Sequence, residues 1–220
     1  MNSFFGRHTT QSTCSASSVA TKEIGHGPCR AYISAIVKLL LLNKRPVFRV
    51  CFTGIWKSSI RLDTKIHLYQ TYIVPVLLYG CETWSTTKFQ CARIDAFDMW
   101  ALCKILRMPY TRHVTNVEVR ATTGCRPLSI LVTDRCLRLF GHIACSSPQE
   151  DHHRAVAAVI RRLPLEWKRP LGRPSHTWLR AVEADLGQQN IGLASAWTKA
   201  AIRDDWRRIV DTATPQRSTL

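Results

Sequence analysis

The stretch KFQCARIDAFDMWALCKILR, which runs from Lys88 to Arg107, decides the fold class of this chain of 220 residues. Its apolar side chains recur at the intervals i, i+3, i+7, i+8 and i+11, which is the period of one helix face. They are Ile94, Phe97, Ala101, Leu102 and Ile105. Pro109 follows closely, and proline cannot continue a helix because it lacks a backbone N–H. The spacing therefore predicts a long amphipathic helix with Phe97 and Leu102 in a core.

The segment upstream of this stretch has the same period. Residues 62–80 can begin a helix at Asp63 or Thr64 and end it at Gly80. Pro75 lies inside the segment and predicts a kink or a junction of two helices. The expected buried face is Ile66, Tyr69, Ile73, Val76 and Leu77.

Two more helices are predicted directly downstream. Thr115 and Glu118 fit a capping box, in which each side chain satisfies a backbone N–H at the helix start, and Gly124 ends this short helix. After Pro127 a longer helix follows, whose apolar side carries Leu137, Phe140 and Ala144. Its opposite side carries a narrow cationic ridge of Arg135, Arg138 and His142.

The C-terminal part also reads as helical. Ser175 can cap a helix that ends at Gly187 and carries Trp178, Leu179, Val182 and Leu186. Ser195 opens a last helix with Ile202, Trp206, Ile209 and Val210 on one face. Strand-type alternation is scarce, so the sequence predicts an all-α fold: packed amphipathic helices in two small subdomains with a basic Pro/Gly loop between them.

The charge balance favours a polyanionic partner. The chain has 31 Lys and Arg against 15 Asp and Glu, a net charge of +16, and phosphate contacts dominate non-specific nucleic-acid affinity. The densest basic window contains a single acidic residue, Glu166. Its basic residues are Arg161, Arg162, Lys168, Arg169 and Arg173. We expect RNA or DNA to be held there and on the ridge of Arg135 and Arg138, through the phosphate backbone. The alternatives are a solvated loop and an ordinary surface helix of a basic protein.

No catalytic site is visible in the sequence. The adjacent pair Asp204 and Asp205 has Arg203, Arg207 and Arg208 as ready partners, which predicts solvated ion pairs rather than a two-metal site. Gly-rich nucleotide loops, H-E-x-x-H and G-x-S-x-G are missing. We therefore expect no catalytic residues, no cofactor and no small-molecule substrate.

The cysteines predict free thiols. Their number, nine, is odd, and no pair has C-x-x-C spacing. One cluster contains residue types that can bind a metal: Cys136, His142, Cys145 and His152. Its spacing resembles no compact zinc template, so no metal is expected.

Nothing in the sequence predicts a membrane anchor. Residues 1–30 are rich in Ser and Thr, and the apolar run from Ala31 to Leu42 is too short for a span and contains Lys38. No lipidation signal is present. We expect a nuclear or cytoplasmic location and no membrane partner.

Five separate motifs, in this order and over about residues 50–210, carry a family resemblance. They are LDTKIHLYQTYIVPVLLYGCETW, IDAFDMWALCKILRMPYTRHVTNVEVRATTG, LRLFGHIAC, RPLGRPSHTWLRAVEADL and RDDWRRIV. They resemble the C-terminal region of the endonuclease/reverse transcriptase of non-LTR (LINE-type) retrotransposons, which follows the RNA-directed DNA polymerase. The resemblance implies that this chain is the last part of such a protein. The catalytic turn of the polymerase would lie upstream of Leu62, where residues 1–61 hold one Glu and no Asp.

The resemblance also assigns roles to regions of the chain. It implies an unrelated or poorly ordered segment at 1–45 and a helical thumb-like region at 46–145. The residue patterns themselves predict the boundary in a basic linker at 146–175, followed by a helical hairpin at 176–220. The stretch RPLGRPS resembles the Arg-Gly-Arg-Pro core of minor-groove hooks, with Leu171 in place of the first Arg. The expected function is a truncated reverse transcriptase fragment that grips template RNA or target DNA without catalysis. The alternative is a helical protein-interaction fragment or a nonfunctional relic of a transposable element.

Overall fold

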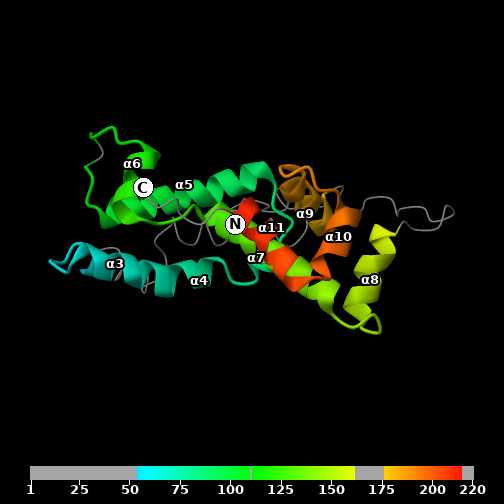
Figure 1. Ribbon diagram of the computed structural model, residues 1–220. Coiled ribbons are helices and arrows are strands. Elements are labelled where there is room, and N and C mark those ends of the chain that lie inside the picture. Colours follow the sequence, from blue (N-terminus) through cyan, green and yellow to red (C-terminus); the bar gives the residue numbers. More distant parts are fainter. Residues whose placement is uncertain (1–53, 110, 162–175, 215–220) are drawn as a thin grey trace, which may run out of the picture.

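The computed structural model describes residues 54–109, 111–161 and 176–214, and within these ranges it contains helices and no strand. The all-α prediction is therefore confirmed. The helices in chain order are α3 (Leu62–Leu68), α4 (Val74–Leu77), α5 (Lys88–Ile105), α6 (Asn116–Thr123), α7 (Leu128–Cys145), α8 (Asp151–Ile160), α9 (Trp178–Gly187), α10 (Leu193–Ala200) and α11 (Arg203–Ala213) (Figure 1). A π-helical turn, Tyr69–Ile73, joins α3 to α4, and a 3-10 turn, Cys81–Thr83, follows α4.

Helix α5 forms as predicted. All of its predicted apolar face is buried, with Phe97 at 2% exposure and Leu102 at 0%. A capping box that the sequence analysis missed begins the helix: Thr87 Oγ1 accepts from the Gln90 backbone N–H at 3.3 Å, and Gln90 Oε1 accepts from the Thr87 N–H at 2.8 Å. This reciprocal pair satisfies two backbone donors at the helix start and so fixes where α5 begins.

Residues 62–80 form one helical rod interrupted by a wider turn. The π-helical turn precedes α4, whose first turn contains Pro75. Because Pro75 has no N–H to donate to the carbonyl four residues earlier, the predicted kink takes the form of this wider turn. Gly80 ends the rod with φ 67°, as predicted.

The π-helical turn also explains one wrong prediction in this rod. Val76 was expected in the core, but it is 59% exposed. A π turn adds a residue to one helical turn, so the positions that face the core move along the chain by one. Leu77 and Leu78 accordingly take the inward positions, at 3% and 0% exposure.

Two of the predicted caps differ in detail. Thr115 Oγ1 accepts from the Glu118 backbone N–H at 3.3 Å, as predicted, but the Glu118 carboxylate pairs with Arg112 at 3.3 Å. Helix α9 is capped by Thr177, which accepts from the Arg180 backbone N–H at 3.5 Å. The predicted cap Ser175 lies outside the described residues.

The core of the described chain has two parts, and α7 belongs to both. The first part lies between α3, α4, α5 and the N-terminal half of α7, which contributes Leu128, Val132 and Cys136. The second part lies between the C-terminal half of α7 and α9, α10 and α11. At its centre Phe140 meets three tryptophan rings, with centroids 6.3 Å, 5.7 Å and 5.4 Å away; they are Trp178, Trp197 and Trp206.

The expected division of the chain differs from this arrangement. A boundary at residue 145 would separate Leu137 and Phe140 from the C-terminal helices against which they pack. The expected linker 146–175 also contains α8. Helix α8 is linked to α7 by His153, whose Nδ1 lies 3.2 Å from the Ile143 carbonyl oxygen. Residues 162–175 of the expected linker lie outside the described part of the chain.

The last helix was predicted as one element, but it is two. Helix α10 ends at Ala200 and α11 begins at Arg203, with Ile202 extended between them (φ −101°, ψ 108°) and 58% exposed. In one straight helix Trp206 would lie about 120° around the axis from Ala200, at about 100° per residue. The break lets both side chains enter the second part of the core, where they are 6% and 0% exposed.

Candidate nucleic-acid interface

The predicted basic window falls mostly on residues that the structure does not describe. Arg162, Lys168, Arg169 and Arg173 lie outside the described residues. Arg161 is described: it follows the last turn of α8 and is exposed. The described residues therefore include one member of this window, and the remaining candidates for an interface are the other basic side chains of the described chain.

The two arginines of the predicted ridge on α7 have different surroundings. Arg135 is partly buried, and its Nη1 donates to the Leu78 carbonyl oxygen at 3.1 Å and to Cys81 Sγ at 3.7 Å. It ties α7 to the end of the first helical rod, so its guanidinium is used within the fold. Arg138 is exposed and remains a surface cation.

Arg138 connects α7 to α11 at the surface. Its Nε donates to Asp134 Oδ2 at 2.9 Å, and its Nη2 lies 3.9 Å from Asp211 Oδ1. The hydrogen bond to Asp134 raises the pKa of the guanidinium. The charge of Arg138 is therefore permanent, and the side chain is 52% exposed.

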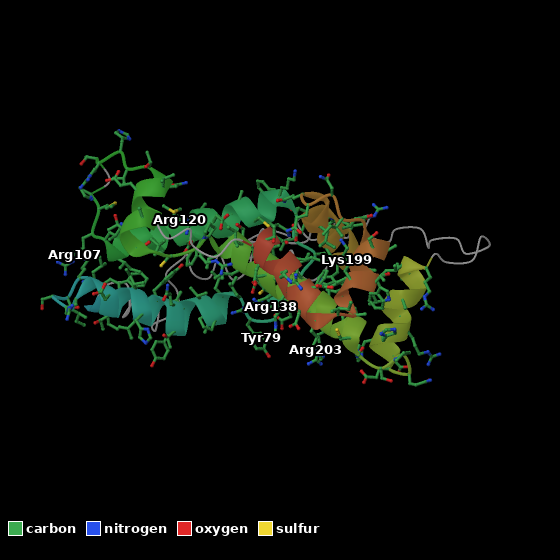
Figure 2. All side chains as sticks on the ribbon, viewed as in Figure 1. Tyr79, Arg107, Arg120, Arg138, Lys199 and Arg203 are labelled. Carbon is green, nitrogen blue, oxygen red and sulfur yellow. The ribbon has the colours of Figure 1, made fainter. Side chains whose placement is uncertain are left out.

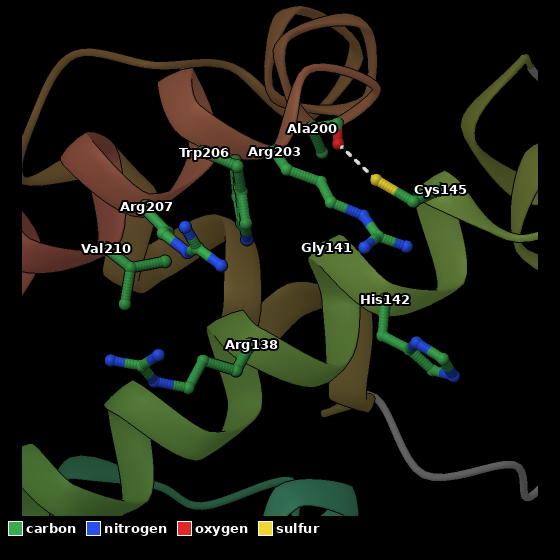
Figure 3. Close-up of a pocket in the computed structure, with 9 residues that line it drawn as sticks. All are labelled: Arg138, Gly141, His142, Cys145, Ala200, Arg203, Trp206, Arg207 and Val210. Atoms are coloured by element: carbon green, nitrogen blue, oxygen red, sulfur yellow. Dashed lines mark hydrogen bonds between the residues drawn. The ribbon is translucent and has the colours of Figure 1, made fainter.

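A surface groove of about 300 Å³ lies beside Arg138, between α7 and α11 (Figure 3). Three arginines line it: Arg138 from α7, and Arg203 and Arg207 from α11. Among the described residues no carboxylate belongs to its lining, which otherwise consists of Gly141, His142, Cys145, Ala200, Trp206 and Val210. Side chains from two helices thus bring three permanent positive charges to one depression.

The floor of the groove depends on a glycine. A Cβ at position 141 would lie 2.2 Å from Cδ1 and from Nε1 of Trp206, so no larger residue fits at this crossing. The Trp206 indole donates from Nε1 to the Leu137 carbonyl oxygen at 2.9 Å. This buried hydrogen bond fixes α11 against α7 and thereby holds Arg203 and Arg207 opposite Arg138.

The arginines of α11 differ in how they are paired. Arg207 Nη1 lies 3.5 Å from Asp204 Oδ1, and Arg208 Nη2 lies 2.9 Å from Asp205 Oδ1. The ion pairs predicted for the two aspartates are therefore confirmed. Arg203 has no carboxylate within ion-pair distance among the described residues, so its positive charge is uncompensated locally.

One exposed tyrosine lies on the same side of the molecule as the groove. In Figure 2, Tyr79, Arg138 and Arg203 extend on one side, whereas Arg107 and Arg120 lie toward the end that holds α6. Tyr79 is 76% exposed. It directly follows Leu78, whose carbonyl oxygen accepts from Arg135 of α7. An exposed aromatic ring beside arginines can stack on a base of a single strand.

The four residues of the candidate metal cluster have separate surroundings. Cys136 Sγ donates to the Cys81 carbonyl oxygen at 3.4 Å, and burial raises the pKa of this thiol to about 12. Cys145 Sγ donates to the Ala200 carbonyl oxygen at 2.8 Å, and His152 Nε2 lies 2.8 Å from Glu150 Oε2. His142 lines the arginine groove. Within the described ranges, no group of three or more His, Cys, Asp or Glu side chains could hold a metal ion.

Helices long and apolar enough to cross a membrane are absent from the described part of the chain. No family model matches the chain, and neither a curated protein nor a solved structure matches it.

Proposed function

We propose that this chain binds the phosphate backbone of RNA or DNA in the groove between α7 and α11, as a non-catalytic C-terminal fragment of a retrotransposon reverse transcriptase. The observation that carries the proposal is the convergence of Arg138, Arg203 and Arg207 on a depression without a carboxylate in its lining. The five sequence motifs support the reverse transcriptase origin. The net charge of +16 supports a polyanionic partner acting in the nucleus or the cytoplasm.

The ion pair between Arg207 and Asp204 leaves Arg207 available to a phosphate. The pair between Arg207 and Asp204 joins side chains that are 71% and 80% exposed, and such pairs contribute about 0–1 kcal/mol. A phosphate contact to the same exposed guanidinium has a similar direct energy, and the release of condensed counterions from the nucleic acid adds a further favourable contribution. Exchange of the carboxylate for phosphate is therefore favourable, and Arg203 has no carboxylate to exchange within the described part of the chain.

The described acidic side chains support a role without catalysis. A two-metal polymerase or nuclease site needs carboxylates that converge on the same ions. Asp204 and Asp205 instead pair with different arginines. Asp95 accepts from the backbone N–H and hydroxyl of Ser129, at 3.0 Å and 2.6 Å. These carboxylates have structural partners, and the proposed activity is binding alone.

One observation favours the alternative of a protein-interaction fragment. Tyr72, Val76 and Tyr79 are 66%, 59% and 76% exposed and follow one another along the first helical rod. An exposed apolar stripe of this kind can receive a partner helix. Removing charge from the groove would leave such an interaction unchanged, which separates the two functions experimentally.

The test is the affinity for fluorescein-labelled single-stranded RNA, single-stranded DNA and duplex DNA, measured by fluorescence anisotropy. We expect the double variant Arg203→Gln, Arg207→Gln to bind about tenfold more weakly at moderate salt, because it lacks two charge-assisted contacts. The loss should be similar for A·T-rich and G·C-rich strands, since phosphate contacts carry no sequence information.

Arg112→Gln is the control for position, and it removes one positive charge against two in the double variant. Arg112 is 62% exposed and paired to Glu118 at 3.3 Å, so it resembles Arg207 in exposure and pairing, but it lies near α6. We expect its affinity to stay close to that of the unchanged chain. An equal loss in Arg112→Gln would mean that total charge, and not the groove, determines binding. No measurable binding by the unchanged chain would leave the protein-interaction fragment or relic as the better explanation.

A further inference from the structure

A second arginine-lined pocket lies at another place in the fold, outside the α7–α11 groove. It has a volume of about 320 Å³ and lies between the first helical rod, α5 and the connection from α6 to α7. Its polar lining includes Gln70, Asp98, Arg126 and Arg135. No contact in the α7–α11 groove involves Arg126, so this pocket is unexplained by the proposed function.

Arg126 has buried donors without acceptors. Its Nε and one terminal nitrogen, Nη2, are inaccessible to solvent, and neither has a hydrogen-bond partner. Each unsatisfied buried donor costs about 1–3 kcal/mol, and more when the group is charged. A guanidinium in this state lacks the planar, two-oxygen acceptor that its fork of N–H groups fits.

The carboxylate in the pocket is already committed to other partners. Asp98 is fully buried; its Oδ1 accepts from the Tyr69 hydroxyl at 2.6 Å, and its Oδ2 lies 2.8 Å from Arg120 Nη2. Burial raises the pKa of Asp98, while Tyr69 and Arg120 oppose that shift by stabilising the ionised form. Asp98 therefore balances Arg120 and leaves Arg126 without a counter-charge.

The local charge sum defines the missing group. Arg126 and Arg135 line the pocket, and Asp98 is the one carboxylate among its described lining residues. Arg120 is not in the lining but neutralises Asp98 through their ion pair, so the charges of Arg126 and Arg135 leave an excess of two. One terminal nitrogen of Arg135 donates to the Leu78 carbonyl oxygen, which is neutral, so the positive charge of Arg135 is not compensated by this contact. A phosphate monoester or inorganic phosphate carries about −1.5 to −2 near pH 7, which matches this excess better than a carboxylate does.

We propose that the Arg126 pocket binds one phosphate group, either inorganic phosphate or the terminal monophosphate of a nucleic-acid strand. Because Nε and Nη2 of Arg126 are covered in the described side-chain position, the guanidinium turns toward the pocket when phosphate binds, and two phosphate oxygens then accept from these donors. The charges of Arg120 and Arg135 stabilise the remaining oxygens from a distance. This site is independent of the α7–α11 groove. It binds its ligand whether or not the groove binds a strand.

The test compares thermal unfolding of the full chain in sodium phosphate and in sodium chloride at equal ionic strength. We expect phosphate to raise the midpoint of the unchanged chain. In Arg126→Met, the phosphate concentration that gives the same rise should be about tenfold or more higher, because the two charge-assisted contacts are gone. Without phosphate, Arg126→Met should melt at a higher temperature than the unchanged chain, since methionine fills similar space without buried unpaired donors.

Two controls and a competition complete the design. Arg154→Met, which replaces an arginine that is 67% exposed on α8, should keep the full response to phosphate, as should Arg203→Gln with Arg207→Gln. A 5′-phosphorylated oligonucleotide that competes with phosphate, where its 5′-hydroxyl counterpart does not, identifies a strand end as the source. Competition by neither identifies free phosphate. Equal responses to phosphate and chloride, or equal responses of Arg126→Met and the unchanged chain, would overturn the proposal.

Discussion

Single residues determine whether the arginine groove can exist. Gly141 is the residue over which Trp206 lies, and Trp206 in turn holds α11 against α7 through its bond to the Leu137 carbonyl oxygen. The helical periodicity of the sequence places residue 141 in α7. It does not indicate that this position must lack a side chain because Trp206, 65 residues later, packs against it. The groove arginines therefore depend on a contact that no local pattern reveals.

Gly141→Ala should destabilise the chain by about 1–3 kcal/mol, although alanine is the better helix former. The added methyl would lie 2.2 Å from two atoms of the Trp206 ring, so the ring has to move, and overpacking of this kind outweighs the propensity gain of up to about 1 kcal/mol. Urea unfolding followed by circular dichroism measures the change.

Gly187→Ala is the control for this prediction. Gly187 is the last residue of α9, and a Cβ there would have no atom within 4 Å. We expect Gly187→Ala to be neutral or to stabilise by up to about 1 kcal/mol. If Gly141→Ala behaved in the same way, α7 and α11 would not cross as closely as described.

Helix α5 contributes to the first part of the core. Of its two phenylalanines, one is buried in that core and the other is exposed to solvent. Phe97 is 2% exposed, with its ring centroid 5.9 Å from that of Trp100, while Phe89 is 66% exposed beside Arg93. Phe97→Ala should cost about 3–5 kcal/mol because it leaves a cavity, whereas Phe89→Ala should cost less than about 1 kcal/mol. Chemical unfolding of both variants checks the difference, and similar costs would contradict the placement of α5.

The helices that sequence patterns predict best are those with a periodic face and clear ends. Helix α5 has both, and α7 and the short helix closed by Gly124 follow the same rule. The break between α10 and α11 was missed because residues 200–203, AAIR, contain no glycine or proline. It forms because tertiary packing needs both Ala200 and Trp206 inside, which overrides local helix preference.

The side chains of the candidate interface were harder to predict than the helices that carry them. The angular position of Arg135 and Arg138 on α7 was clear from the sequence, but the partners that they meet come from distant segments. The Leu78 carbonyl oxygen accepts a hydrogen bond from Arg135, while α11 places Arg203 and Arg207 near Arg138. The basic window around Lys168 lies outside the described residues, so its role stays a prediction.

The sharing of α7 between both parts of the core gives the molecule its arrangement of charges. Helices α3, α4 and α6 lie toward one end and α8 and α10 toward the other, with α7 and α11 crossing between them (Figure 1). Arg135 on α7 lines the Arg126 pocket, and Arg138 one turn later lines the arginine groove. One helix therefore fixes the spacing of both proposed phosphate contacts.

The salt dependence of duplex DNA binding tests most directly whether the groove holds the phosphate backbone. Each phosphate contact contributes about −0.9 to the slope of log K against log salt concentration. We predict that the triple variant Arg138→Gln, Arg203→Gln, Arg207→Gln has a slope shallower by about 2–3 than that of the unchanged chain, while Arg112→Gln changes it by less than about 1. A slope that stays the same in the triple variant would contradict phosphate binding between α7 and α11.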